Sequence, residues 1–418
     1  MGYVAGRTSA AIETGDQAMK GHVRERGKGN WYAVLSVKDE MGKRKVKFRS
    51  LADCRTKKEA QTACARLITE IDAGSFIQTS KTTLREWIEH WVSIGCPGSK
   101  RRKEVGARTI ERYAQLLRCH VIPTLGDRPL QQLQSNEIDA LYVRLGEKIA
   151  ARTALHVHSV LGACLGTAAR TRKIARNPMR ELVKVPSPGE ADHGTALEAE
   201  QLRTLVQGFM GSVLFSIVAV AAFTGARRNE ILALRRDDLD VAAKTLRIER
   251  AIEETDKHGL RIKGPKTERG KRIITIDDDL IALLVAERER HLRIVAGVPD
   301  GVAVDLALVR LPPGALVFPN SPGPGEDFSS LKLRNPRNTT KEFMRKAAGL
   351  GFSALRLHDL RGTHETLLLD AGVPVHVVAA RCGHDPAVLL RSYAKRTRKA
   401  DTSAAAVIAR LSRGTLGI

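Results

Sequence analysis

Two different periods of apolar residues follow one another near the start of the chain. From 22 to 55, apolar and polar residues alternate, as in the run from Trp31 to Val37 and again around Val46 and Phe48. Alternation is typical of strands that bury one face. From 56 to 74 the apolar residues instead recur every three or four positions, which is typical of a helix. The pattern predicts a small three-stranded sheet packed on one helix.

A helical period then dominates from about 80 to 183. Apolar stripes recur at helical spacing, and Gly95, Pro97 and Pro123 interrupt them. The stretch predicts an all-helical domain. It is followed by Val185-Pro186-Ser187-Pro188-Gly189, a composition that is typical of a linker.

The longest part of the chain, from 197 to 400, mixes both periods. Helical patterns surround three strand-like segments, Thr245 to Ile252, Leu260 to Lys263 and Lys271 to Ile276. The residues from Gly264 to Gly270 read as the loop of a β-hairpin between the last two segments. The apolar run from Phe209 to Phe223 is too short to cross a bilayer and predicts a buried helix.

These patterns predict a multidomain protein that is mainly α with small β-sheets. The expected parts are a flexible tail (1–21), a small basic sheet-and-helix domain (22–75), a helical domain (80–183), a linker (184–196), a mixed α+β domain (197–400) and a C-terminal tail (401–418).

Charge points to a polyanionic partner. Lys and Arg number 69 against 46 acidic residues, a net charge of +23, and each phosphate that a basic protein neutralises releases a counterion. A ribosomal or membrane-surface protein remains an alternative on charge alone. Aromatic residues make up only 4%, which argues against a domain that stacks single-stranded bases on rings. Two basic runs are candidate DNA contacts, although such runs are commonly just solvated: Lys43, Arg44, Lys45 and Arg101, Arg102, Lys103.

The cysteines and the N-terminus favour a cytoplasmic protein. Six scattered cysteines form no CxxC pair, so neither a disulfide framework nor a zinc site is expected. Residues 1–20 lack the apolar run of a signal peptide. A DNA-binding protein of this kind would associate with the nucleoid.

Residues suited to phosphodiester chemistry occur in the α+β domain. Cleavage without water needs a nucleophile, a base, cations for the developing charge and an acid for the leaving oxygen. Arg227 follows Gly225, which is expected to end one helix just before the next begins, and Glu230 lies one turn later, where it can clamp the guanidinium. Alone, this motif is better interpreted as a surface ion pair.

Four further candidates follow along the chain. Lys266, on the expected hairpin, can act as a flexible acid. His358 and Arg361 are three residues apart and share a face if they lie on a helix. His384 follows a glycine, and Tyr393 comes nine residues later among basic residues that could activate it. Each motif alone has a structural interpretation as a packed or capping residue.

The order and spacing of these motifs carry more information than any one of them. TGARRNE, PKTERGKR, HDLRGTH and CGH, followed by Tyr393, resemble the motif series of the tyrosine recombinase (phage integrase) family. The resemblance covers residues 197–400 in detail. It is looser for the helical domain, which is similar to the family's core-binding domain, and for the N-terminal unit, which is similar to an arm-site DNA-binding domain.

The resemblance implies a role for each matching side chain. Arg227 and Arg361 would hold the scissile phosphate and stabilise its pentacoordinate transition state, and His384 would donate a hydrogen bond to a phosphate oxygen. Glu230 would support Arg227 without taking part in the chemistry.

The remaining matches imply the covalent and proton-transfer steps. Tyr393 would be the nucleophile and form a 3′-phosphotyrosyl bond, with His358 as its acid–base partner. Lys266 would protonate the leaving 5′-oxygen. No metal or other cofactor is implied.

The family also implies partners and an assembly. These are double-stranded DNA attachment sites held in a C-shaped clamp, a homotetramer that exchanges strands through a Holliday junction, and accessory directionality or DNA-bending proteins, with no membrane. The expected function is integration or excision of a phage or mobile element. The C-terminal tail is a candidate for docking on a neighbouring protomer.

Departures and alternatives remain at this point. Gly362, Cys382 and Asn229 replace more usual family residues. A type IB topoisomerase shares the chemistry, and a degenerate integrase could bind DNA without cleaving it. A metal-dependent transposase would need three converging carboxylates, for which Asp237-Asp238 and the 277–279 run are candidates. Helix capping explains the 277–279 run better.

Overall fold

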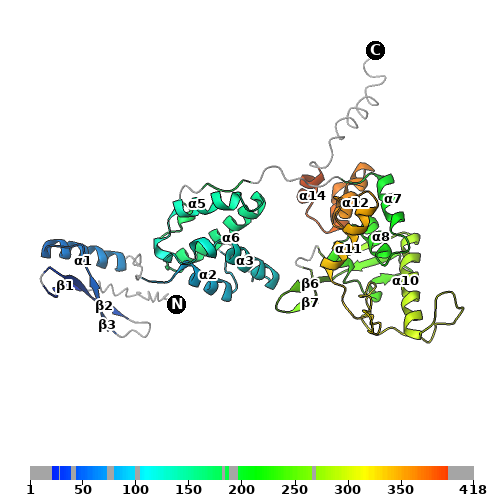
Figure 1. Ribbon diagram of the computed structural model, residues 1–418, viewed down its shortest axis with the longest axis horizontal. Helices are drawn as coiled ribbons and strands as arrows, with labels where there is room; N and C mark the ends of the chain where they lie inside the picture. The colour runs from blue at the N-terminus through cyan, green and yellow to red at the C-terminus, as the bar shows by residue number, and fades with distance from the viewer. Residues whose placement is uncertain are drawn as a thin grey trace, which may run out of the picture. The chain divides into compact units, whose positions relative to one another are not determined.

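The computed structural model describes most of the chain in two compact units, 1–188 and 189–418, and each unit is described here by itself (Figure 1). The described residues are 21–27, 29–38, 44–72, 80–98, 104–180, 184–187, 196–265 and 270–393. Lys43, Lys266, the basic run 101–103 and the C-terminal tail therefore lie outside them, as do the side chains of Arg44 and Lys45.

The N-terminal part of the first unit is a three-stranded antiparallel sheet with one helix. Its elements are β1 (Gly21–Glu25), β2 (Trp31–Lys38), β3 (Arg44–Ser50) and α1 (Lys57–Asp72), with strand order β1-β2-β3. Ala33 and Leu35 of β2 are buried with Ala60 and Cys64 of α1. Since alternate residues of a strand face opposite sides, Val34 points away from this core together with its partner Phe48. The predicted sheet-and-helix fold is confirmed.

The rest of the first unit is helical, as the apolar stripes predict. Its elements are α2 (Leu84–Ser93), α3 (Ala107–His120), α4 (Ile122–Leu125), η1 (Leu130–Gln132), α5 (Ser135–Gly146), α6 (Ala151–Arg170) and η2 (Pro178–Arg180). Two buried tryptophans of α2 hold the bundle together. Trp87 donates its indole N–H to the carbonyl of Cys164 at 3.2 Å, and Trp91 stacks on Tyr113 of α3.

The second unit is a mixed α+β domain. It contains α7 (Ala199–Gly208), α8 (Phe215–Thr224), α9 (Arg228–Ile231), η3 (Arg236–Asp238), β4 (Leu239–Asp240), β5 (Thr245–Ile248), β6 (Ala251–Thr255), β7 (Gly259–Lys263), β8 (Arg272–Thr275), α10 (Asp278–Ala296), α11 (Pro336–Gly349), α12 (Asp359–Asp370), α13 (Val375–Cys382) and α14 (Pro386–Tyr393). The multidomain, mainly α fold with small sheets is confirmed.

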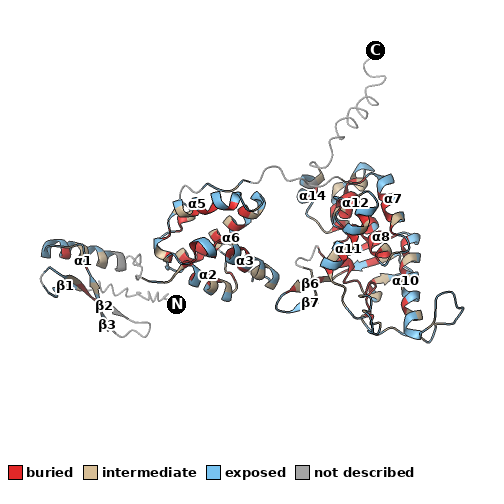
Figure 2. Ribbon diagram, viewed as in Figure 1, coloured by how far each residue is buried: buried red, intermediate tan, exposed pale blue. Residues whose placement is uncertain are grey.

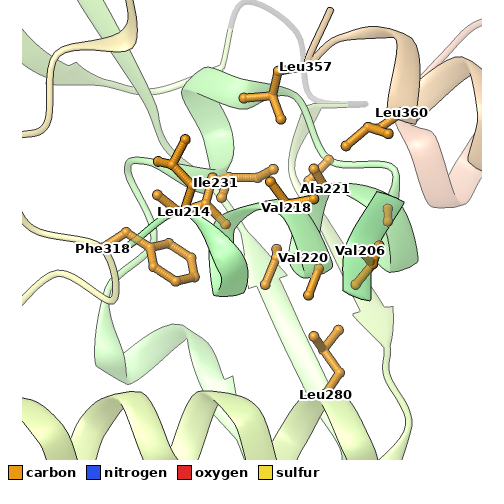
Figure 3. Close-up of a cluster of buried hydrophobic side chains, with 14 of the residues drawn as sticks. Val206, Leu214, Val218, Val220, Ala221, Ile231, Leu280, Phe318, Leu357 and Leu360 are labelled. Atoms are coloured by element: carbon orange, nitrogen blue, oxygen red, sulfur yellow. The ribbon is translucent and has the colours of Figure 1, made fainter. Parts of the chain in front are cut away.

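Helix α8 forms the centre of this domain. Its side chains Val218, Val220 and Ala221 are buried, and Ile231 and Leu360 lie in the same apolar cluster (Figure 3). Because α8 is apolar on every side, it has to be covered all round. Buried residues accordingly concentrate on α8 and on α12 beside it (Figure 2). The predicted buried helix is present from Phe215 onward, whereas the residues just before it make a turn.

The strands pair differently from the prediction of a hairpin around Lys266. β7 pairs with β6, and β8 pairs with β5 in a separate sheet with order β4-β5-β8. The β6–β7 turn is closed by Gly259 in a left-handed conformation (φ 60°) and by the His258 N–H, which donates to the Thr255 hydroxyl. Because this tight turn joins β6 directly to β7, these two strands pair with each other. The prediction of a hairpin between β7 and β8 is therefore wrong, and the segment from Gly264 to Gly270 connects two separate sheets.

Candidate active site

The break after α8 places Arg227. Gly225 ends the helix with φ 63°, and a Cβ atom there would lie 2.7 Å from the His364 ring and 3.0 Å from Cys382 Sγ. Only glycine fits both the backbone conformation and the space. The chain then turns, and Arg227 becomes the residue that precedes the first turn of α9.

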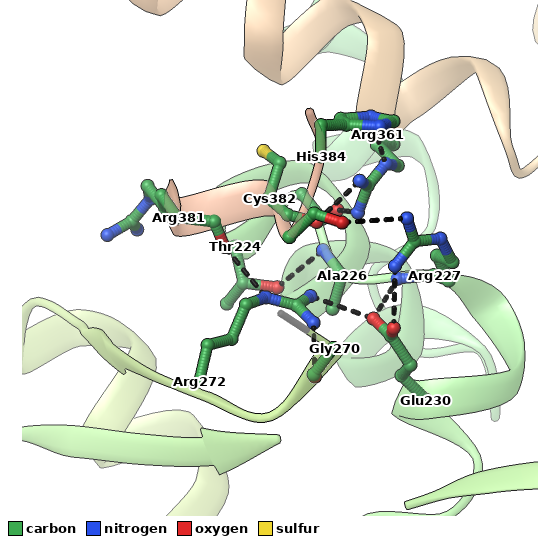
Figure 4. A network of polar contacts seen from close by, with 12 residues as sticks. Thr224, Ala226, Arg227, Glu230, Gly270, Arg272, Arg361, Arg381, Cys382 and His384 are labelled. Atoms are coloured by element: carbon green, nitrogen blue, oxygen red, sulfur yellow. Dashed lines mark hydrogen bonds and ion pairs between the residues drawn. The ribbon is translucent and has the colours of Figure 1, made fainter. Parts of the chain in front are cut away.

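Arg227 is clamped as the sequence predicts, yet it still reaches solvent. Its Nη1 donates to Glu230 Oε1 at 2.9 Å, its backbone N–H donates to Glu230 Oε2 at 2.9 Å, and Nη2 donates to the carbonyl of Gly383 at 3.2 Å (Figure 4). The side chain remains 38% exposed. It is therefore a positioned cation that an anion from outside can contact.

Arg361 lies in the first turn of α12 and is almost completely buried, with 2% of its surface exposed. Its Nη1 donates to the carbonyl of Gly225 at 2.7 Å, and its Nη2 donates to that of Cys382 (Figure 4). Burial, followed by the charge of Arg227, lowers the pKa of Arg361 to about 10, so it stays cationic at neutral pH. A guanidinium has five N–H groups, so these contacts leave donors for a phosphate.

His384 follows Gly383, which ends α13 in the left-handed conformation (φ 66°). The side chain is 21% exposed, and its Nε2 lies 2.7 Å from Glu365 Oε1 and 3.2 Å from Arg361 Nε. The ends of α8 and α13 and the start of α12 thus bring Arg227, Arg361 and His384 together in one basic cluster, here named the pocket.

His358 precedes the first turn of α12, at the same end as Arg361. The residue is exposed, but desolvation by the surrounding protein, followed by the nearby charge of Arg361, lowers its pKa. A histidine with a lowered pKa is mostly neutral at pH 7 and can accept a proton.

Tyr393 lies elsewhere. It is the last residue of α14, and its hydroxyl donates to Asp370 Oδ1 at 2.8 Å. Asp370 ends α12, nine residues after Arg361, which places it roughly 13 Å further along the helix axis at 1.5 Å per residue. The structure therefore brings the predicted arginines and histidines together at one end of α12 and holds the tyrosine hydroxyl at the other end.

Two residues of the pocket, Arg272 and Glu365, were not predicted from the sequence. The side chain of Arg272 of β8 is 6% exposed; its Nη2 donates to Glu230 Oε2 and its Nε to the carbonyl of Arg381, each at 2.8 Å (Figure 4). Burial alone would raise the pKa of Glu230, but Arg272 and then Arg227 outweigh it and lower that pKa. The second residue, Glu365, contacts both Arg361 and His384. Arg272 ends PKTERGKR and Glu365 directly follows HDLRGTH, but only the folded chain reveals their partners.

His364 supports the pocket from behind. Its ring Nδ1 donates to the carbonyl of Ala222 at 2.9 Å, and Arg381 Nε donates to its Nε2 at 3.1 Å. Burial, followed by the charge of Arg381, lowers the pKa of His364 to about 4. Both ring nitrogens are engaged by protein groups, which fits a neutral structural histidine and not a zinc ligand.

The departures from the family pattern also have local explanations. The Asn229 side chain donates to the carbonyl of Ile252 at 2.8 Å and so ties α9 to β6. Cys382 is buried beside Gly225. Gly362 is buried within the first turn of α12, but the structure offers no specific reason for glycine there.

The competing metal site finds no support in the described part of the chain. Asp277 caps α10, accepting from the Leu280 N–H at 2.8 Å, so the capping prediction is confirmed. Asp238 accepts from Arg250 and from the Arg235 N–H. Across the described ranges, no cluster of three or more His, Cys, Asp or Glu is arranged to hold a metal ion. No helix in these ranges is long and apolar enough to span a membrane.

Comparison with protein families gives two matches. Residues 196–399 match the phage integrase family, and residues 22–71 match an arm DNA-binding domain. An integrase of Streptomyces ambofaciens is 25% identical over 391 residues, which cover 90% of this chain and 92% of that protein. An integrase of Mycobacterium phage FRAT1 is 24% identical over 307 residues, covering 73% of this chain and 81% of that protein.

Solved structures share the fold. The Tn1549 transposon integrase in complex with transposon right end DNA superposes with a TM-score of 0.58 at 18% identity, covering 79% of this chain and 99% of that one. A lambda integrase dimer bound to a core site superposes with a TM-score of 0.54 at 15% identity, covering 90% and 95%.

The fold and the matches define a class of enzyme that breaks and rejoins DNA strands through a tyrosine. The chain belongs to the tyrosine recombinase (phage integrase) family.

Proposed function

We propose that this recombinase cleaves and rejoins duplex DNA through a 3′-phosphotyrosyl bond at Tyr393, and that it integrates or excises a phage or mobile element. The observation that carries the proposal is the convergence of Arg227, Arg361 and His384 at the ends of three helices. Two positioned guanidinium groups and an imidazole can surround the non-bridging oxygens of one phosphate.

The arginines stabilise the transition state. As Tyr393 attacks phosphorus, negative charge grows on the non-bridging oxygens, and donors held in place before the reaction stabilise that charge without reorganising. Arg227 and Arg361 are held by Glu230 and by the carbonyls of Gly225 and Gly383. Loss of one such donor costs on the order of 100-fold in rate.

Proton transfer completes a balanced exchange. The Tyr393 oxygen forms a bond to phosphorus, the bond from phosphorus to the 5′-oxygen breaks, and that oxygen takes up a proton. His358, kept mostly neutral by its lowered pKa, accepts the tyrosine proton. We assign protonation of the leaving oxygen to Lys266. Attack by a 5′-hydroxyl on the phosphotyrosine reverses these steps and reseals a strand.

Before it reacts, Tyr393 has to leave Asp370. The hydroxyl is hydrogen-bonded at the opposite end of α12 from Arg361. In our proposal, DNA binding and assembly move α14 so that the phenol reaches the phosphate. The hydrogen bond to Asp370 keeps the nucleophile away from the pocket until that happens.

DNA contact extends beyond the pocket in this proposal. Lys43, Arg44, Lys45 and the run Arg101, Arg102, Lys103 contact double-stranded attachment sites, supported by the net charge of +23 and by the arm DNA-binding match. We also propose the domain limits that the sequence predicts.

Assembly is the remaining part of the proposal. A lambda integrase tetramer bound to a Holliday junction superposes with a TM-score of 0.53 at 15% identity. By analogy we propose a homotetramer on DNA, with accessory directionality or DNA-bending proteins, acting in the cytoplasm at the nucleoid.

The test is capture of the covalent intermediate. The full chain is mixed with a plasmid carrying the DNA that flanks its own gene, in EDTA, and the reaction is stopped with SDS. We expect a protein–DNA adduct that Tyr393→Phe abolishes and that Tyr113→Phe, which keeps the ring stacked on Trp91, leaves intact. An adduct in Tyr393→Phe would contradict the assignment. Relaxation of supercoils without recombinant products would favour the topoisomerase alternative, and binding without adduct on any DNA would favour a degenerate integrase.

A further inference from the structure

A second buried carboxylate lies in the pocket beside the one that clamps Arg227. Glu365 is on α12, one turn after Arg361, and its side chain is only 5% exposed. A single oxygen, Oε1, lies 3.1 Å from Arg361 Nε and 2.7 Å from His384 Nε2. Burying a carboxylate is unfavourable unless charged or polar partners compensate it, and here both partners belong to the proposed phosphate site.

The three contacts allow one consistent placement of hydrogens. A guanidinium only donates, and an ionised carboxylate only accepts. If His384 Nε2 accepted a hydrogen from Arg361, it would carry no hydrogen of its own, and its lone pair would lie 2.7 Å from a carboxylate oxygen that also only accepts, which is repulsive. With a hydrogen on Nε2, both His384 and Arg361 donate to Oε1, and the 3.2 Å between the two nitrogens is the consequence of sharing that acceptor.

Glu230 and Glu365 hold their arginines in the same way. Glu230 accepts from Arg227 and from Arg272, and it lies three residues after the arginine that it supports. Glu365 lies four residues after Arg361 and bridges to His384. In each case a buried carboxylate one helical turn away joins an arginine to a second basic side chain from a distant segment.

We propose that Glu365 is a positioning residue for DNA cleavage, which holds the Nε2–H and the ring orientation of His384 and the plane of the Arg361 guanidinium, so that His384 donates to the phosphate from Nδ1 as an imidazolium once the phosphate is bound. This inference rests on the proposed function. Glu365 does not touch the phosphate and acts through His384 and Arg361. Because it adds negative charge beside the phosphate, it aids the rate of cleavage and not the affinity for DNA.

The kinetic test compares single-turnover adduct formation at saturating protein for wild type, Glu365→Gln, Glu365→Ala, His384→Ala and the double variant Glu365→Ala/His384→Ala. We expect the rate of adduct formation to fall ~10-fold or more in each Glu365 variant, as when a residue that orients a reactive side chain is removed. DNA affinity should be unchanged or tighter. Because Glu365 works largely through His384, its removal should cost less than about threefold once His384 is alanine. Glu200→Gln, an exposed carboxylate on α7, is the matched control.

Three results would overturn the proposal: no loss of rate in either Glu365 variant, an equal loss with and without His384, or a loss of rate matched by a loss of DNA affinity. Thermal unfolding of each variant identifies simple misfolding. If wild type forms no adduct, the proposed function itself has failed.

NMR spectroscopy tests the role of Glu365 even if no adduct forms. In the full chain labelled with ¹⁵N-histidine, the ring signal that disappears in His384→Ala belongs to His384. We expect it to report the Nε2–H tautomer in wild type and to change in Glu365→Ala. An Nδ1–H tautomer in wild type would contradict the placement of hydrogens above.

Discussion

In the proposed mechanism the two ends of α12 contribute to the same reaction, and they differ in how firmly they hold their side chains. At the N-terminal end, Arg361 is buried and donates to carbonyls from two other segments. At the C-terminal end, exposed Asp370 accepts one hydrogen bond from Tyr393 on the short helix α14. The residues that we propose to bind the phosphate are therefore already held in place without DNA, whereas the proposed nucleophile is held apart from them by an exposed hydrogen bond.

The largest expected effect comes from breaking the buried end. Arg361→Ala removes the arginine that donates to the carbonyls of Gly225 and Cys382 and that pairs with the buried carboxylate of Glu365. We expect a loss of ~3–5 kcal/mol in unfolding free energy, as when one partner of a buried ion pair is removed. Adduct formation should fall ~100-fold or more. Urea unfolding and single-turnover cleavage measure the two quantities.

Arg227→Ala is the matched comparison, because its side chain is 38% exposed. It should lose a similar factor in rate with little loss of stability. Equal destabilisation by the two substitutions would mean that burial does not distinguish the two arginines.

The unfolding free energy should fall in acid because of His364, which packs behind the pocket. The pKa of His364 is lowered to about 4 from an ordinary value of 6.5, so between these values the unfolded chain binds a proton that the native state does not. Stability should therefore fall as pH drops from 6.5 towards 4, by up to ~1.4 kcal/mol per pH unit from this residue. His364→Gln should flatten the slope of unfolding free energy against pH. An unchanged slope in the variant would show that His364 is not responsible.

The smallest effect is expected at the tyrosine end. Asp370→Ala removes the acceptor that holds the Tyr393 hydroxyl. An exposed hydrogen bond contributes little, so we expect adduct formation to become about threefold faster, with unchanged stability. Asp300→Asn, on an exposed loop, is the control. A slower reaction in Asp370→Ala would assign Asp370 to the chemistry and not to holding the tyrosine in reserve.

The local features of the fold and site could be predicted from the sequence. Gly225 ends α8, Arg227 begins α9 and Glu230 clamps it, because each depends on residues within one helical turn. The alternation near Trp31 likewise predicts β2 and its sheet, since one strand face has to be buried.

Features that depend on distant partners could not be predicted. The sequence pattern of Leu260 to Lys263 allows pairing with the strand before it or with the strand after it. The tight turn at Gly259 favours the strand before it, β6. Glu365 and Arg272 read as ordinary charged residues until the fold places His384, which follows α13, beside Glu365 and places Glu230 of α9 beside Arg272. The contact between Tyr393 and Asp370 also joins segments that no sequence period links.

The most direct test of the central claim is to locate the covalent bond. The SDS-stable adduct formed in EDTA is digested with a nuclease and a protease, and the peptides are sequenced by mass spectrometry. We predict a nucleotide joined through its 3′-phosphate to Tyr393, within the peptide that follows His384. A nucleotide on any other side chain would contradict it and would leave the hydrogen bond between Tyr393 and Asp370 as a structural contact alone.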